Sequence, residues 1–167
     1  IVLTRAALGW DSGPFVIPEA AYEAWDARHR GLADETRWVD AFEAYSKAIA
    51  IEGQSVLSLA RTVVLPAAQR HLGNVAQAVG AARAAGLKVD AQQRRLQAMN
   101  ELTEQLVARI DDLGAQFEHA EHHAGAPGDH AKTYRDKVVP AMARLRELAD
   151  GIETMVDDAE WPLPKYR

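Results

Sequence analysis

The sequence predicts an all-α fold, a bundle of about four helices with long antiparallel arms and an irregular N-terminal lead-in. Apolar residues recur at three- and four-residue steps over most of the chain, which is the period of one helix face. Hydrophobic residues make up 48% of the 167 residues, yet aromatic residues make up only 7%. Alanine, the best helix former, supplies much of the apolar fraction, and no segment alternates in the pattern of a strand.

The length allows one well-cored domain and is short for two. We expect three regions: an irregular lead-in over residues 1–17, a single helical bundle domain over residues 18–160, and a Pro-rich C-terminal tail over residues 161–167.

The lead-in is punctuated by glycine and proline. Its segment Gly9-Trp10-Asp11-Ser12-Gly13 follows no strand pattern and matches neither a phosphate-binding loop nor a nucleophile elbow, so we expect a plain loop. Pro18 then opens a short helix that runs through Trp25, and Gly31 is expected to close it.

Asp34 is the expected cap of a long second helix. Its apolar stripe consists of Trp38, Phe42, Tyr45, Ile49, Val56, Leu59 and Val63. Pro66 lies inside this pattern and is expected to kink the helix, which then loses definition toward Gly86.

The third helix has the most regular pattern. Its seam consists of Leu96, Met99, Thr103, Leu106, Ile110, Leu113 and Phe117, at alternating steps of three and four. Such a seam requires partner helices to bury it.

Residues 125–128, Gly-Ala-Pro-Gly, break the chain before a fourth helix that Asp129 is expected to cap. The stripe of that helix consists of Tyr134, Val138, Met142, Leu145, Ile152 and Val156, with Pro140 as a second kink. Trp161-Pro162-Leu163-Pro164 ends the helical structure. We expect Trp161 to fold back onto the bundle, and an anchor on a neighbouring surface is the alternative.

Charge and composition exclude several classes of function. A net charge of −5 and a pI near 5.7 argue against a nucleic-acid-binding surface. Zero cysteines exclude disulfides and thiolate metal sites and fit a cytoplasmic protein. No apolar run approaches the roughly 20 residues of a membrane span. Because the chain starts at Ile1 without a signal peptide, we expect a piece of a longer protein.

No catalytic or cofactor-binding residues can be nominated from spacing. The sharpest cluster is the histidine group His119, His122 and His123, which could offer metal ligands from one helix face. The preferred interpretation is a solvated helix C-terminus, where imidazoles meet the negative end of the helix dipole, and hence no metal site. A charged run, Glu35, Arg37, Glu43, Lys47 and Glu52, is interpreted as an exposed helix face, with a docking face as the alternative.

Four segments together resemble the C-terminal region of type III glutamine synthetases. They are residues 43–52 (EAYSKAIAIE), residues 64–68 (VLPAA), residues 138–146 (VVPAMARLR) followed by Asp150 and Glu153, and residues 161–166 (WPLPKY). The resemblance implies a C-terminal structural and assembly domain of a homo-oligomeric, cytoplasmic enzyme that ligates ammonia to glutamate.

The same resemblance implies ATP and Mg²⁺ for the parent enzyme and no cofactor in this chain. The parent's catalytic domain and neighbouring subunits would be the partners, with no nucleic acid and no membrane. Two alternatives remain open: a stand-alone metal- or ligand-binding bundle around His119, His122 and His123, and a regulatory protein that binds a synthetase.

Overall fold

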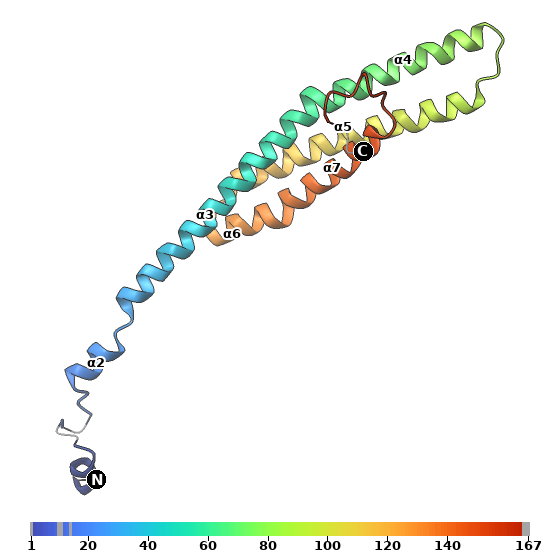
Figure 1. Ribbon diagram of the computed structural model, residues 1–167. Helices are drawn as coiled ribbons and strands as arrows, with labels where there is room; N and C mark the ends of the chain where they lie inside the picture. The colour runs from blue at the N-terminus through green and yellow to red at the C-terminus, as the bar shows by residue number, and fades with distance from the viewer. Residues whose placement is uncertain (1, 10–11, 14, 165–167) are drawn as a thin grey trace. The chain divides into compact units, whose positions relative to one another are not determined.

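The computed structural model describes residues 2–9, 12–13 and 15–164. Every regular element in this part of the chain is a helix, so the predicted all-α class is confirmed (Figure 1). The chain divides into two compact units, Ile1–Asp40 and Ala41–Arg167. The domain boundaries expected from the sequence stay a prediction.

The first unit holds α1 (Val2–Ala7), α2 (Glu19–Trp25) and the start of α3 (Arg28–Leu59). The lead-in is therefore partly helical, contrary to expectation. Gly31 and Asp34 were expected to close one helix and cap the next, but both lie inside α3. The break between α2 and α3 falls at residues 26–27, where the Asp26 carboxylate accepts a hydrogen bond from the backbone N–H of Arg28 at 3.0 Å.

The second unit is built from three long helical stretches. The first runs from α3 through the π-helical turn η1 (Ala60–Val64) into α4 (Leu65–Ala84). The second is α5 (Asp90–Glu121). The third joins α6 (Pro127–Thr133), the π-helical turn η2 (Tyr134–Val138) and α7 (Val139–Glu153). Helix α4 turns back into α5 at Gly86, whose φ of 81° suits glycine, and α7 lies along α5 (Figure 1).

The seam predicted for α5 is confirmed. Met99, Thr103, Leu106, Ile110, Leu113 and Phe117 are all buried, and Leu96 is half-buried. The stripe of the last helical stretch is confirmed as well, with Met142 half-buried and Ala141 taking the more central position.

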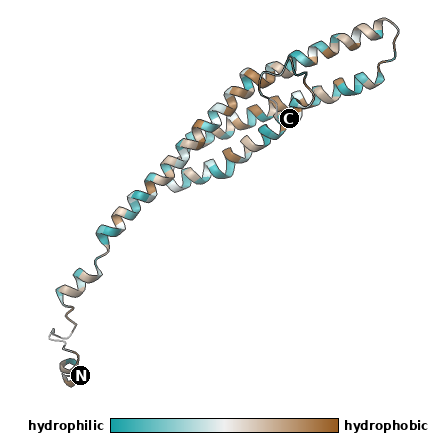
Figure 2. Cartoon of the chain, in the orientation of Figure 1, coloured by the Kyte–Doolittle hydropathy of each residue, from teal (hydrophilic) through white to brown (hydrophobic). Residues whose placement is uncertain are grey.

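The stripe predicted for α3 is displaced from the one that packs. Trp38, Tyr45 and Leu59 are exposed. The buried positions of α3 and η1 are instead Ser46, Gly53, Leu57, Ala60 and Val64. Several of these side chains are small, so they allow close approach without producing a strong hydropathy signal. Hydrophobic and polar residues accordingly mix along the helix in Figure 2.

Both predicted proline kinks coincide with a π-helical turn. Pro66 and Pro140 each follow such a turn by two residues, and in each the residue before proline donates its N–H to the carbonyl five residues back, Leu65 to Ala60 and Val139 to Tyr134. Proline lacks an N–H, and its ring crowds the carbonyl four residues earlier. A locally widened turn relieves that crowding, so the helix continues through the proline.

The chain after α7 folds back onto the bundle, as preferred from the sequence. Helix α7 ends at Glu153, and Trp161 is 8% exposed in the core. The Asp129 cap is wrong, because Ala126 occupies the cap position of α6 and Asp129 lies in its first turn.

One helical stretch of the described chain, Glu19–Ala84, contains a window with a mean hydropathy of 1.3, long and apolar enough by composition to cross a membrane. The same stretch supplies Leu57, Ala60 and Val64 to the bundle core. A single stretch of this kind is weak support for a membrane span.

Candidate functional site

The histidines singled out from the sequence lie where α5 ends. The rings of His119 and His123 are 6.0 Å apart between centroids, and the imidazole of His122 contacts the Glu118 carbonyl oxygen at 2.8 Å. The residues that the structure describes contain no group of three or more His, Cys, Asp or Glu side chains placed to hold a metal ion. Of these histidines, His122 contacts a carbonyl oxygen of the last turn of α5.

A second polar cluster joins the C-terminal tail to α4. The Glu160 carboxylate contacts His71 Nδ1 at 2.6 Å and also accepts a hydrogen bond from the Asn74 side chain. His71 and Glu160 are both largely shielded from solvent. Sequence reasoning missed this cluster, because 89 positions separate its histidine from its carboxylate and nothing local marks the pair.

The junction of α2 and α3 forms a cavity in the first unit. About 530 Å³ in volume, it is lined by Tyr22 and Trp25, by the carboxylates of Glu19, Glu23 and Asp26, and by Arg28. Arg28 Nε donates to the Asp26 carboxylate at 2.7 Å, and this hydrogen bond holds the pKa of Asp26 below its usual value and raises that of Arg28. The one cation of the cavity is therefore already paired.

The first unit has a surface rich in large apolar side chains. Phe15 is fully exposed, Trp25 is 88% exposed and Leu3 is 86% exposed; Leu8, Val16, Ile17, Tyr22 and Leu32 are exposed as well. None of the side chains of this unit whose burial the structure describes is buried. The part of this unit that the structure describes therefore has no core of its own.

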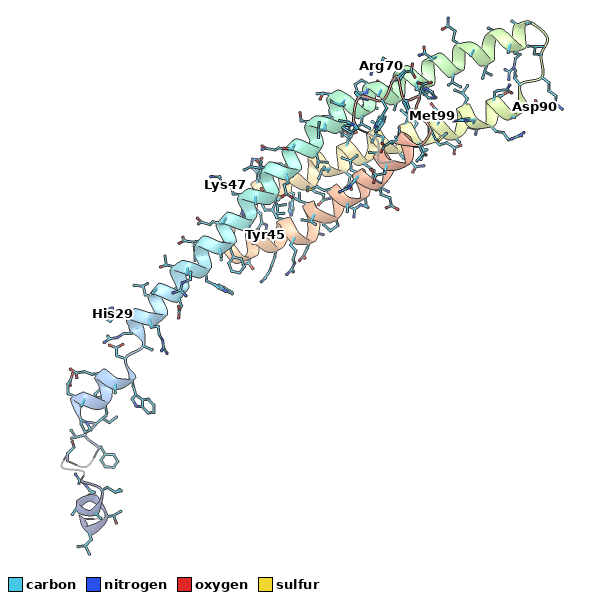
Figure 3. All side chains as sticks on the ribbon, in the orientation of Figure 1. His29, Tyr45, Lys47, Arg70, Asp90 and Met99 are labelled. Atoms are coloured by element: carbon cyan, nitrogen blue, oxygen red, sulfur yellow. The ribbon has the colours of Figure 1, made fainter. Side chains whose placement is uncertain are left out.

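The charged run of the sequence lies on an exposed helix face, as interpreted. Glu35, Arg37, Glu43, Lys47 and Glu52 are all exposed, and Arg37 pairs with Asp34 at 3.3 Å. Tyr45 and Lys47, labelled in Figure 3, show the side chains of this part of α3.

Comparison with known proteins connects the N-terminal part of the chain to one family. Residues 1–64 match the family model for the transketolase thiamine diphosphate-binding domain. Transketolase 2 of Xanthobacter flavus is 32% identical over 117 residues, which is 70% of this chain and 15% of that protein. Transketolase 1 of Escherichia coli is 50% identical over 48 residues, which is 29% of this chain and 7% of that protein.

A protein of another kind matches too. The type-3 glutamine synthetase of Dictyostelium discoideum is 29% identical over 138 residues, which is 79% of this chain and 19% of that protein. The chain thus spans less than a fifth of the length of each of these relatives. No solved structure matches it.

The predicted family is wrong. A C-terminal domain of a type III glutamine synthetase, with its ligase activity and its implied ATP and Mg²⁺, is contradicted by the transketolase family model and by transketolase relatives of up to 50% identity. The expectation of no cofactor in this chain is wrong as well, because the matched domain is described as binding thiamine diphosphate. The four segments that carried the resemblance are short, and two of them are proline-centred helix turns whose packing role is described above.

The described residues do not by themselves fit the diphosphate group of that cofactor. A diphosphate requires cationic donors or a divalent cation held by several oxygen ligands. The cavity at the α2–α3 junction offers three carboxylates, which repel an anion, and one arginine that is bound to Asp26. The described residues also lack a cluster suited to a metal ion. We therefore derive no catalytic step through thiamine diphosphate from this chain.

Proposed function

We propose that residues 1–64 are a segment of a transketolase-type, thiamine diphosphate-binding protein, and that the segment packs against the rest of that protein instead of forming the cofactor site alone. One observation carries the proposal: the first 40 residues of the matched segment have large exposed apolar side chains, and none of those whose burial the structure describes is buried. Many large apolar side chains left exposed in one segment favour a contact with another protein surface.

The energetics support an apolar partner surface. Burying a Leu or Phe side chain contributes about 1.5–3 kcal/mol, so Leu3, Leu8 and Phe15 alone represent several kcal/mol that the isolated unit does not gain. The surface of a larger domain would supply this burial. Thiamine diphosphate binding, as the family's description gives it, would then take place between this segment and groups of that larger domain.

The helical bundle of residues 41–167 has a core of its own, and we propose that it serves as a binding module attached to this segment. The cytoplasmic location, the homo-oligomeric state, and the absence of nucleic-acid and membrane partners remain proposals. The lack of cysteine supports the location, and the net charge of −5 supports the absence of a nucleic-acid partner.

A segment exchange tests the proposal. Residues 1–64 would replace the matching segment of the Escherichia coli transketolase 1, and thiamine diphosphate affinity and transketolase activity would be measured on the purified hybrid. We expect both to stay within about tenfold of the parent, because the exchanged segment would restore the same apolar contact surface.

The control hybrid carries Trp25→Asp, which places a charge on the expected contact surface. We expect its affinity for thiamine diphosphate, or its equilibrium constant for folding, to be more than about tenfold lower than that of the first hybrid. A first hybrid that folds but no longer binds thiamine diphosphate would contradict the proposal. So would a Trp25→Asp hybrid that behaves like the unaltered one.

A further inference from the structure

The end of the α4–α5 hairpin has only two helices where the rest of the bundle has three. Helix α7 ends at Glu153, and the tail that follows reaches α4 at His71 and Asn74, where Glu160 binds. Beyond that contact α4 and α5 continue to their connecting turn, and no other helix of the second unit, as far as the structure describes it, lies alongside them (Figure 1). The position of a third helix is therefore open along this part of the hairpin.

An apolar groove occupies that open position. It has a volume of about 430 Å³, and its apolar lining comes from Val75, Ala78, Val79 and Ala82 of α4 and from Val89 at the start of α5. Val79 and Val89 are buried at its base, Val75 and Ala82 are half-buried, and Ala78 is exposed. Small side chains at the rim let a helix approach the backbone of α4 closely.

The charge around the groove is mixed: basic residues lie along the α4–α5 hairpin, whereas Asp157 and Glu160 of the tail line a neighbouring pocket together with Val75 and Ala78. Arg95 of α5 lines the groove, and the segment from Arg70 to Arg95 also contains Arg83, Lys88 and Arg94, against a single acid, Asp90. The whole chain, by contrast, has a net charge of −5. Lys88 is paired with Asp90 at 3.5 Å, whereas the structure gives Arg95 no acidic partner among the described residues. Figure 3 labels Arg70, where this segment begins, and Asp90, which lies near the turn of the hairpin.

We propose that this groove binds an amphipathic helix of another protein, with the apolar face of the helix on Val75, Val79 and Val89 and acidic side chains beside Arg95. The open third-helix position sets the shape of the occupant, and Arg95, which has no acidic partner among the described residues, favours acidic side chains beside it. A second copy of the same hairpin does not fit, because it would bring an equally basic segment against this one. This inference concerns the bundle and is independent of the function proposed for residues 1–64.

Fluorescence anisotropy with the full chain tests the inference. The probe is a labelled, designed helical peptide of about five turns, with leucine on one face and glutamate flanking that face. A second peptide has the same leucines and lysine in place of each glutamate. We expect the acidic peptide to bind with micromolar affinity, and we expect this affinity to fall as the salt concentration is raised. The lysine peptide should bind at least about tenfold more weakly.

Two variants locate the site. Ala78→Glu places a carboxylate in the groove at an exposed position, so the fold should be kept. The substitution should lower the affinity for the acidic peptide by at least about tenfold. Gln77→Glu is the matched control, since it adds the same charge at a neighbouring exposed position outside the groove, and it should change affinity by less than about twofold. Circular dichroism of each variant checks that the helices are intact.

Three results would overturn the inference. They are the absence of acidic-peptide binding to the unaltered chain, equal binding of the acidic and lysine peptides, and equal loss of binding in Ala78→Glu and Gln77→Glu. The segment exchange on transketolase reports on residues 1–64 alone, so the failure of one experiment is distinguishable from the failure of the other.

Discussion

The lack of a side chain at residue 53 decides how closely α3 approaches α5. A Cβ at Gly53 would lie 3.1 Å from Cε2 of Phe117 and 3.5 Å from Cγ1 of Val138. We expect Gly53→Ala to lower the free energy of unfolding by about 1–3 kcal/mol, because Phe117 is buried and has little room to move. Urea denaturation followed by circular dichroism measures this change.

Gly80→Ala is the control for helix propensity. Gly80 lies inside α4, and a Cβ there would meet nothing within 4 Å. We expect this substitution to stabilise the chain by about 0.4–1 kcal/mol through the reduced freedom of the unfolded chain. If Gly53→Ala stabilised the protein as Gly80→Ala should, the close contact with Phe117 would not limit packing.

The two prolines and their π-helical turns have the same arrangement in their helices. Each turn places buried residues in the same register relative to its proline: Ala60, Val64 and Ala67 around Pro66, and Tyr134, Val138 and Ala141 around Pro140. These side chains are fixed in the core, so we expect the widened turn to persist when proline is replaced.

Pro66→Ala and Pro140→Ala should each lower the free energy of unfolding by about 0.4–1 kcal/mol, because alanine gives the unfolded chain more conformations to lose. Urea denaturation of the two variants measures the effect, and helical content by circular dichroism should stay unchanged. Unchanged stability in both variants would contradict the expected restriction of the unfolded chain by the prolines.

The ion pair between α5 and α7 has a predictable dependence on pH. Arg144 donates to the Asp112 carboxylate at 3.2 Å, and this hydrogen bond holds the pKa of Asp112 below its reference value of 3.8. The pair therefore stabilises the fold above that pH, and the contribution is lost as pH falls through the lowered pKa. Because both side chains are partly exposed, we expect Arg144→Gln to cost only a few tenths of a kcal/mol at neutral pH and nothing near pH 2.

The control for this pair is Arg146→Gln on the same helix, whose partner Asp150 lies 3.8 Å away. It should leave the titration of Asp112, followed by NMR, unchanged, whereas Arg144→Gln should move that titration upward. An Asp112 pKa that does not respond to Arg144→Gln would contradict the assignment.

The accuracy of the sequence predictions differs between elements for a physical reason. The α5 seam could be predicted because its core positions carry large apolar side chains such as Leu106, Leu113 and Phe117. The α3 stripe could not, because its core positions include Ser46, Gly53 and Ala60, whereas Trp38 and Tyr45 are exposed. The apolar groove between α4 and α5 was missed because its apolar residues, from Val75 to Val89, lie in an alanine- and glycine-rich stretch. There the apolar and polar faces of the helix differ little in hydropathy.

At the scale of the whole molecule, the core lies entirely in one of the two units. Its buried cluster extends from Leu57 to Trp161, and the residues of the first unit whose burial is described add none to it. Similarity in sequence does not follow the same division, since the family match covers residues 1–64 and so includes the start of the bundle. The four short segments that resembled type III glutamine synthetases indicated the wrong family, although the helices predicted around them are present.

This distribution of the core predicts that residues 41–167 fold without residues 1–40. We expect the truncated chain to melt within about 2–4 °C of the full chain, because the deleted residues contribute no buried side chain among those described. Calorimetry of both chains measures the difference, and limited proteolysis of the full chain should cut first within residues 1–40, where backbone is least protected. A truncated chain that fails to fold, or a first cut within the bundle, would show that the first unit stabilises the second.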